Sequence, residues 1–160
     1  MKNLRYSFIN AGRGVYEAAK ERNMRIHLCF SFYVVLAGFV LDISNTEWAC
    51  VLICIALVLT AECFNTAIEA LCDAVCPEYN PAIGKVKDIT AASVLICAWV
   101  SVAAGCVIFF GKGRPGIALE YFKDYKIITA AIILSLIAWL FIIFKPKDKN
   151  TDIREKKDDR

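Results

Sequence analysis

The sequence predicts an all-α integral membrane protein with an interfacial amphipathic helix at its start, a core of three spanning helices and a fourth spanning helix. Two observations support this fold class. The 160 residues are 58% hydrophobic, with a mean hydropathy of +0.51, whereas soluble domains are about half apolar. The excess lies in four blocks with few or no charges, 26–41, 48–61, 89–110 and 127–144. Runs of about 17–25 apolar residues can cross the hydrocarbon layer as helices, so the shorter blocks need flanking residues.

The first element, residues 3–22, has the pattern of an amphipathic helix. Apolar side chains recur at steps of three and four residues, at Leu4, Phe8, Ala11, Val15 and Ala18. Basic residues occupy much of the remaining surface, as is typical of a helix that lies in the membrane interface. The first apolar block begins only at residue 26 and has no small-residue cleavage site, so we expect no cleaved signal peptide.

The placement of charge predicts which side of the membrane each segment occupies. Residues 1–25 carry six basic residues, and the charged tail 145–160 is rich in lysine and aspartate. The positive-inside rule therefore places both ends in the cytoplasm, with the loop 42–47 outside and the loop 72–88 inside. The segment 111–126 is then an outer loop. The net charge of +3 is too small to indicate a nucleic-acid partner.

Turn residues and cysteines complete the pass along the chain. Pro77 and Pro81 interrupt the inner loop, and the run Gly113-Arg114-Pro115-Gly116 predicts a turn after the third block. The eight cysteines lie mostly in apolar runs and form no CxxC pair. We expect them to pack as small polarizable side chains, although a metal or disulfide role stays open. The lone histidine, His27, is expected to have a packing or interface role rather than a catalytic one.

The second spanning helix is expected to continue past its apolar block, because no glycine or proline occurs between residue 61 and Pro77. On a helix one face would carry a set of polar side chains, Glu62, Asn65, Thr66, Glu69 and Asp73. A charged residue at the bilayer centre costs about 2.5–3.5 kcal/mol. This face should therefore point toward protein or water.

Phosphoryl transfer is the chemistry that this face fits. It needs a carboxylate to hold Mg²⁺ against phosphate oxygens and a base to orient or deprotonate the attacking hydroxyl. Glu62 and Glu69 are about 10 Å apart along a helix, so one can hold the metal while the deeper one meets a lipid hydroxyl. Glu21 could add a second carboxylate or be an ordinary interfacial charge. Lys87 and Asp88 supply a plausible phosphate clamp, and no P-loop motif is present.

Two other interpretations stay open on these residues alone. A solvated helix end would account for Asp73 and Glu69. A small non-enzymatic four-helix transporter could use Glu62 as a proton or cation site. Neither accounts for Asn65 and the Lys87-Asp88 pair gathered on the same side of the membrane as Glu69.

Four segments resemble the prokaryotic diacylglycerol kinase family, including its Gram-positive undecaprenol kinase branch. They are Glu21-Arg22-Asn23-Met24-Arg25-Ile26-His27, Glu62-Cys63-Phe64-Asn65-Thr66-Ala67-Ile68-Glu69, Asp73 and Lys87-Asp88. The resemblance covers about residues 7–110. It implies a small homotrimeric membrane enzyme with three spans per chain and active sites shared between subunits, so the block 127–144 departs from the family pattern.

The resemblance also implies a role for each matching residue. Glu62 would be the general base, Glu69 and Glu21 would bind Mg²⁺, and Asn65 would support the site. Contacts to ATP would come from Lys87 and Asp88, with the loop residues Glu78, Tyr79 and Asn80 nearby. Asp73 would brace the site.

The expected activity is ATP-dependent phosphorylation of a membrane lipid hydroxyl at the cytoplasmic face of the cell membrane. The Gram-positive variants of the motifs favour undecaprenol, with diacylglycerol as the alternative. Three regions are expected: a kinase core at 1–111, an outer loop and extra helix at 112–144, and a charged cytoplasmic tail at 145–160.

Overall fold

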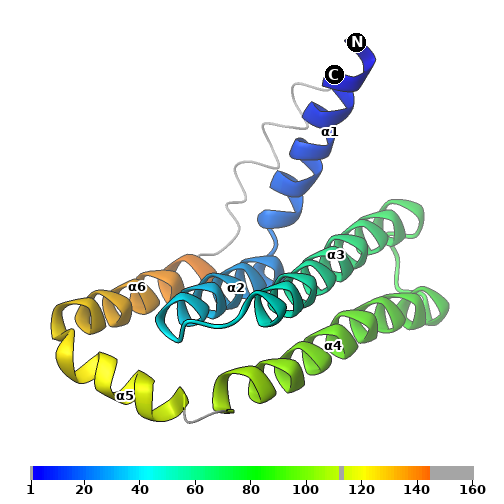
Figure 1. The fold of residues 1–160 in the computed structure, drawn as a ribbon. Helices are drawn as coiled ribbons and strands as arrows, with labels where there is room; N and C mark the ends of the chain where they lie inside the picture. Colours follow the sequence, from blue (N-terminus) through cyan, green and yellow to red (C-terminus); the bar gives the residue numbers. More distant parts are fainter. Residues whose placement is uncertain (1, 112–113, 145–160) are drawn as a thin grey trace.

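The computed structural model describes residues 2–111 and 114–144, and every regular element in that part of the chain is a helix (Figure 1). The helices are α1 (Lys2–Ala19), α2 (Arg22–Val40), α3 (Asn45–Val75), α4 (Pro81–Phe110), α5 (Arg114–Asp124) and α6 (Lys126–Phe144). The all-α prediction is confirmed. Gly113 of the predicted turn and the tail 145–160 lie outside the described residues.

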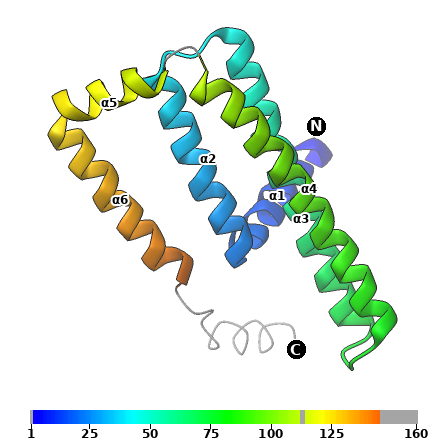
Figure 2. The same cartoon turned by 90° about the horizontal axis from the view of Figure 1, so that it is seen from below.

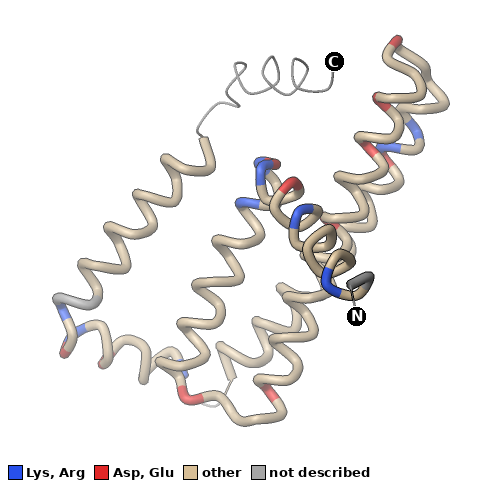
Figure 3. Tube along the Cα trace, turned by 90° about the horizontal axis from the view of Figure 1, so that it is seen from above, with Lys and Arg blue, Asp and Glu red and all other residues tan. Residues whose placement is uncertain are grey.

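Three helices, α2, α3 and α4, are long and apolar enough to cross a membrane. A fourth span is counted if α5 and the segment Thr129–Phe144, which meet at 99°, are taken as one broken span. Charged residues gather on α1, near the helix ends and along the half of α3 and α4 nearer their connection, whereas long stretches of the spanning helices carry none (Figure 3). This distribution is typical of helices that cross a hydrocarbon layer.

The antiparallel hairpin of α3 and α4 is longer than a bilayer core is thick. α3 has 31 residues, or about 46 Å at 1.5 Å per residue, against a hydrocarbon core of about 30 Å. The hairpin therefore continues past the start of α2 (Figure 2). We call this end of the bundle, where residues 76–80 join the two helices, the loop end.

α6 packs antiparallel on α2, on the side away from the hairpin (Figure 2). Near the middle of the two helices the hydroxyls of Tyr33 and Ser135 are 2.7 Å apart. At the start of α2, Nη1 of Arg25 donates to the backbone carbonyl of Ile142 at 2.6 Å. Since Ile142 is near the end of α6, this helix lies beside α2 from its middle to its start. The predicted helix at 127–144 is thus present.

α1 leaves the bundle at a steep angle (Figure 1). Its apolar side chains Leu4, Phe8 and Val15 are largely exposed, and Ala18 is buried near its end. An apolar face without protein cover on a helix rich in basic residues suits a location against a membrane surface. The structure agrees with the predicted amphipathic helix at 3–22.

α5 lies where the sequence predicted only an outer loop. Arg114 begins the helix and Pro115 follows in its first turn, where proline is tolerated because no backbone N–H donor is needed. The guanidinium of Arg114 donates to both carboxylate oxygens of Glu47 at 2.9 and 2.8 Å and to the carbonyl of Ile108. These contacts join α5 to the start of α3 and the end of α4.

The best-packed part of the bundle is the end opposite the loop end. Ile43, Val51 and Ile108 form a buried cluster there. Gly38 lies against Trp48, and a Cβ at Gly38 would come within 2.8 Å of the indole ring. Glycine at this position therefore allows α2 to approach α3 closely. These contacts hold α2, α3 and α4 together at the end of the bundle opposite the loop end.

Candidate active site

The polar face of α3 lies toward the loop end and begins with two buried residues. Glu62 is 2% exposed and Asn65 is 3% exposed. Glu62 is 17 residues after Asn45, the first residue of α3, which is about 26 Å along the axis and close to the edge of a hydrocarbon core about 30 Å thick. The carboxylate is enclosed by protein, which avoids the cost of exposing it to lipid at that level.

Asn65 connects the two carboxylates of this face. Its side-chain Nδ2 donates to Oε1 of Glu69 at 2.9 Å. Its Oδ1 atom is buried and accepts no hydrogen bond from any described residue. A buried acceptor without a donor costs about 1–3 kcal/mol. The amide oxygen beside Glu69 is therefore suited to a water molecule or a cation.

Glu21 brings a third carboxylate to this region from the N-terminus of α2. It is half-buried, and the side chains of Glu21 and Glu69 both lie close enough to Glu62 to act on it electrostatically. Within the described part of the chain no three His, Cys, Asp or Glu side chains are grouped closely enough to hold a metal by themselves. Mg²⁺ typically takes one or two carboxylates together with waters and substrate phosphates. The donors present fit that kind of site.

An ion pair joins the two helices of the hairpin beyond this acidic face. Nζ of Lys87 on α4 lies 2.5 Å from Oδ1 of Asp73 on α3. The carboxylate of Glu69 also acts electrostatically on the ammonium group of Lys87. Acidic and basic residues face each other along this part of the hairpin (Figure 3). Asp73 thus joins α3 to α4 through Lys87, and the bracing role that the resemblance implied for it stays a prediction.

The remaining predicted residues lie on the surface of the loop end. Glu78, Tyr79, Asn80 and Asp88 are exposed, Tyr79 by 93%. Oδ1 of Asn80 accepts from the backbone N–H of Ala82 at 2.9 Å and caps α4, a role that Pro81 in the next position could have indicated. No hydrogen bond among the described residues joins these four side chains to Glu62 or Glu69.

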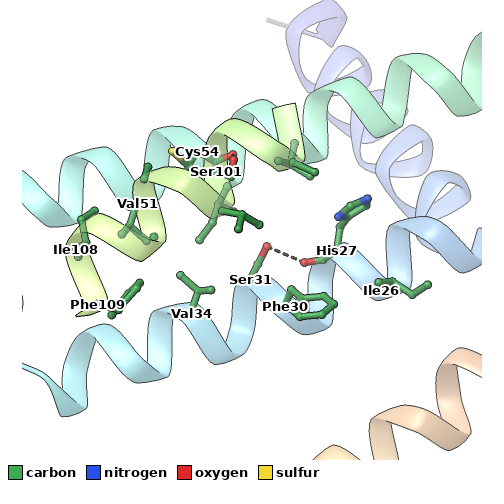
Figure 4. A pocket seen from close by; sticks show the side chains of 16 residues that line it. Ile26, His27, Phe30, Ser31, Val34, Val51, Cys54, Ser101, Ile108 and Phe109 are labelled. Carbon is green, nitrogen blue, oxygen red and sulfur yellow. Dashed lines mark hydrogen bonds between the residues drawn. The ribbon is translucent and has the colours of Figure 1, made fainter. Parts of the chain in front are cut away.

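The structure also contains a groove that the sequence interpretation did not identify. A cavity of about 310 Å³ lies between α2, α3 and α4 and is lined almost entirely by apolar side chains (Figure 4). His27 stands toward one end of the groove, whereas Ile108 and Phe109 lie toward the other (Figure 4). Apart from Ile26 and His27, the lining residues belong to none of the matched motifs, because the groove depends on how far α2 lies from α4.

Fold and site together define a class of protein. Membrane-crossing helices enclose a carboxylate and an amide at one boundary, and an amine and further carboxylates stand just beyond it, within reach of water. This is the arrangement expected of a membrane-embedded enzyme that transfers a charged group between a water-soluble donor and a lipid.

Comparison with known proteins places the chain within this class. Residues 9–109 match the family described as Prokaryotic diacylglycerol kinase. The chain is 35% identical to the undecaprenol kinase of Bacillus subtilis (strain 168) over 107 residues, 66% of this chain and 87% of the relative. It is 30% identical to the diacylglycerol kinase of Escherichia coli (strain K12) over 109 residues, 68% of this chain and 81% of the relative. The chain belongs to the prokaryotic diacylglycerol kinase family and is a multi-pass membrane lipid kinase that uses ATP as the phosphate donor.

Family membership favours an enzyme over the non-enzymatic transporter that the sequence had left open. An enzyme accounts for the acidic face and for Lys87, whereas the transporter accounted for Glu62 alone. The matched range, 9–109, includes most of α1 and all of α2 and α3, and ends within the last turn of α4. α5 and α6 are outside it.

Proposed function

We propose that this chain transfers the γ-phosphate of ATP to the hydroxyl of undecaprenol, giving undecaprenyl phosphate and ADP. The observation that carries the proposal is the enclosed carboxylate of Glu62 at the membrane boundary, the depth at which the hydroxyl of a membrane alcohol lies. The undecaprenol kinase of Bacillus subtilis is 35% identical, and the variant of the motif at 21–27 points the same way. Diacylglycerol is the second candidate, because other relatives carry that name.

Glu62 is the general base in this proposal. Its carboxylate accepts the proton of the lipid hydroxyl while the hydroxyl oxygen forms a bond to the γ-phosphorus. The bond between that phosphorus and the bridging oxygen breaks, and ADP leaves with the electron pair. Positioned bases typically contribute about 10²–10⁴-fold to the rate. Asn65 supports the site by holding Glu69 in place through its amide.

Glu69 and Glu21 would hold Mg²⁺, and the buried Oδ1 of Asn65 is a further oxygen on the same side. When bound with ATP, the cation would neutralise charge on the phosphate oxygens. Lys87 and Asp88 would contact the nucleotide. Glu78, Tyr79 and Asn80 in the loop would lie near the bound nucleotide.

The enzyme would work as a homotrimer with active sites shared between neighbouring chains. Supporting this, Tyr79 is 93% exposed and has little contact with its own chain, so a neighbouring chain is the natural partner of the loop. Mixing two inactive variants tests the proposal: chains with Glu62→Gln and chains with Lys87→Ala should together regain a fraction of the wild-type rate. No recovery at any mixing ratio would argue against shared sites.

The loop end would face the cytoplasm from the cell membrane. Six basic residues precede or begin α2, whereas the segment 42–47 has none, and ATP is available in the cytoplasm. The proposed organisation is a kinase core at 1–111, an outer segment with an additional helix at 112–144, and a tail at 145–160. This division is supported by the family match, which ends at residue 109.

A panel of acceptors tests the proposed substrate. The purified full chain is reconstituted in vesicles with radiolabelled ATP and undecaprenol, diacylglycerol or ceramide, and initial rates are measured. We expect the highest kcat/KM for undecaprenol. A higher value for diacylglycerol would replace undecaprenol as the substrate, and a lack of transfer to every lipid would contradict the proposal.

A further inference from the structure

The additional helix α6 is attached to α2 at two levels (Figure 2). Near the middle of both helices, the hydroxyls of Tyr33 and Ser135 are 2.7 Å apart. Near the start of α2, Nη1 of Arg25 donates to the backbone carbonyl of Ile142 at 2.6 Å. Because α6 lies outside the residues 9–109 that match the family, this attachment is a feature that the chain has beyond its matched core.

The contact between Arg25 and the end of α6 is electrostatically favourable. The last four carbonyls of an α-helix have no donor within the helix, and Ile142 is two residues before Phe144, the last residue of α6. The C-terminal end of a helix carries a partial negative charge, which attracts a cation. The guanidinium of Arg25 therefore caps α6 and is held there.

The same guanidinium belongs to a residue close to the proposed metal site. Glu21 is the N-cap residue of α2, and the backbone N–H of Arg25 donates to its carbonyl at 3.1 Å. A glutamate four residues before an arginine is the spacing at which such side chains pair along a helix, often through two parallel hydrogen bonds. Nε of Arg25 is buried and has no acceptor among the described residues, which is unfavourable. A released Arg25 would therefore gain by turning to the carboxylate of Glu21.

The position of α6 keeps the guanidinium away from the acidic face. α6 and the α3–α4 hairpin lie on opposite sides of α2 (Figure 2). Glu21 is close enough to Glu62, on the hairpin, to act on it electrostatically. Arg25 is instead bound to a carbonyl of α6. The two ends of this short segment therefore serve different sides of α2.

We propose that α6 holds Arg25 so that its guanidinium does not compete with Mg²⁺ for the carboxylate of Glu21. The inference rests on the proposed function, in which Glu21 binds Mg²⁺, and it makes Arg25 a positioning residue. The alternative is an α6 that only adds packing. In that case a displaced α6 would lower stability, and no change at Arg25 would restore the dependence on Mg²⁺.

The experiment first moves the acceptor of Arg25 in the full-length chain. Leu140 is 54% exposed and lies two residues before Ile142, and proline within a helix removes a backbone hydrogen bond and kinks the helix. Leu140→Pro should thus displace the end of α6 with little loss of packing, and Leu140→Ala is the matched control. Where Leu140→Pro does not accumulate, Ser135→Leu serves instead, because its bulk would meet Tyr33 and push α6 off α2.

Proteins are reconstituted in phosphatidylglycerol vesicles, and lipid phosphorylation is titrated with Mg²⁺. We expect Leu140→Pro to raise the Mg²⁺ concentration for half-maximal activity about three- to fivefold, the range that an exposed guanidinium–carboxylate pair supports. Leu140→Ala should keep the wild-type value. Adding Arg25→Gln to Leu140→Pro should return the value to within about twofold of the wild type, because glutamine carries no charge to compete with the metal. Adding Arg22→Gln should not, since Arg22 is exposed and directly follows Glu21, outside the spacing that pairs side chains.

Binding of Mn²⁺ in the presence of a non-hydrolysable ATP analogue, followed by electron paramagnetic resonance, gives a readout that needs no turnover. The Mn²⁺ affinity should fall in Leu140→Pro and recover when Arg25→Gln is added. An unchanged affinity in Leu140→Pro, no recovery with Arg25→Gln, or equal recovery with Arg22→Gln would each overturn the role of α6. Glu21→Ala separates the two proposals: if it binds Mn²⁺ as the wild type does, the proposed metal site itself is wrong, whereas weakened binding in Glu21→Ala beside normal binding in Leu140→Pro refutes only the present inference.

Discussion

Substituting Glu62 by glutamine removes one proton-accepting group and almost nothing else. The two side chains have the same shape, and the position is 2% exposed, so the surrounding packing should be retained. The hydrogen bond between Asn65 and Glu69 lies one turn away and does not involve Glu62. A glutamine amide cannot take the proton of an attacking hydroxyl at neutral pH.

The expected loss follows from the role of a positioned base. Such groups contribute about 10²–10⁴-fold, so kcat for lipid phosphorylation should fall at least about 100-fold, or about 2.7 kcal/mol at 1.36 kcal/mol per factor of ten. The affinity for ATP should change by less than about threefold, because the proposed nucleotide contacts are at Lys87 and in the loop rather than at Glu62.

Initial rates with radiolabelled ATP and undecaprenol, together with equilibrium binding of a fluorescent ATP analogue, measure both quantities. Glu47→Gln is the matched control, because Glu47 is also on α3 but pairs with Arg114 at the opposite end. This control should keep kcat and lower the thermal stability. If Glu62→Gln retains more than half of the wild-type turnover, or if Glu47→Gln loses as much, the assignment of the base is wrong.

Three further predictions concern the metal, the fold and the orientation. Glu69→Ala and Glu21→Ala should each raise the Mg²⁺ concentration for half-maximal activity at least about tenfold, and unchanged Mg²⁺ titrations would remove both from the metal site. Arg114→Ala should lower the unfolding midpoint by several degrees, because its carboxylate partner is mostly buried; an unaltered melting curve would show that α5 is not held by this pair. In a background without the eight native cysteines, a cysteine at Asn80 should react with an impermeant maleimide only after permeabilisation, and one at Asn45 should react in intact cells. Labelling at Asn80 from outside would contradict a cytoplasmic site.

The features that could be predicted from the sequence are those that helix geometry fixes within one segment. Glu62, Asn65 and Glu69 share a face because α3 runs without interruption from its apolar block to Val75, and no glycine or proline breaks it. The spans were predicted for a related reason, since uncharged blocks must be helical to satisfy their backbone in lipid.

Features that depend on how segments meet were not predicted. The ion pair between Lys87 and Asp73 joins residues 14 positions apart through the hairpin, and the groove exists because α2 and α4 both pack on α3. α5 was predicted as a turn because Gly113 and Pro115 are turn residues in isolation. Proline in the first turn of a helix is also permitted, and only the contact of Arg114 with Glu47 shows which conformation is present.

The length of the α3–α4 hairpin has a consequence for how the enzyme meets its two substrates. A hydrocarbon core of about 30 Å would leave about 16 Å of α3 in water. The lipid acceptor would then reach the site by diffusing within the bilayer, and the nucleotide would reach it from solution. Turnover should therefore follow the mole fraction of acceptor in the bilayer rather than its amount per volume of suspension. Adding inert phospholipid at constant total acceptor should slow the reaction, whereas diluting the whole suspension at fixed ATP should leave the rate per enzyme unchanged.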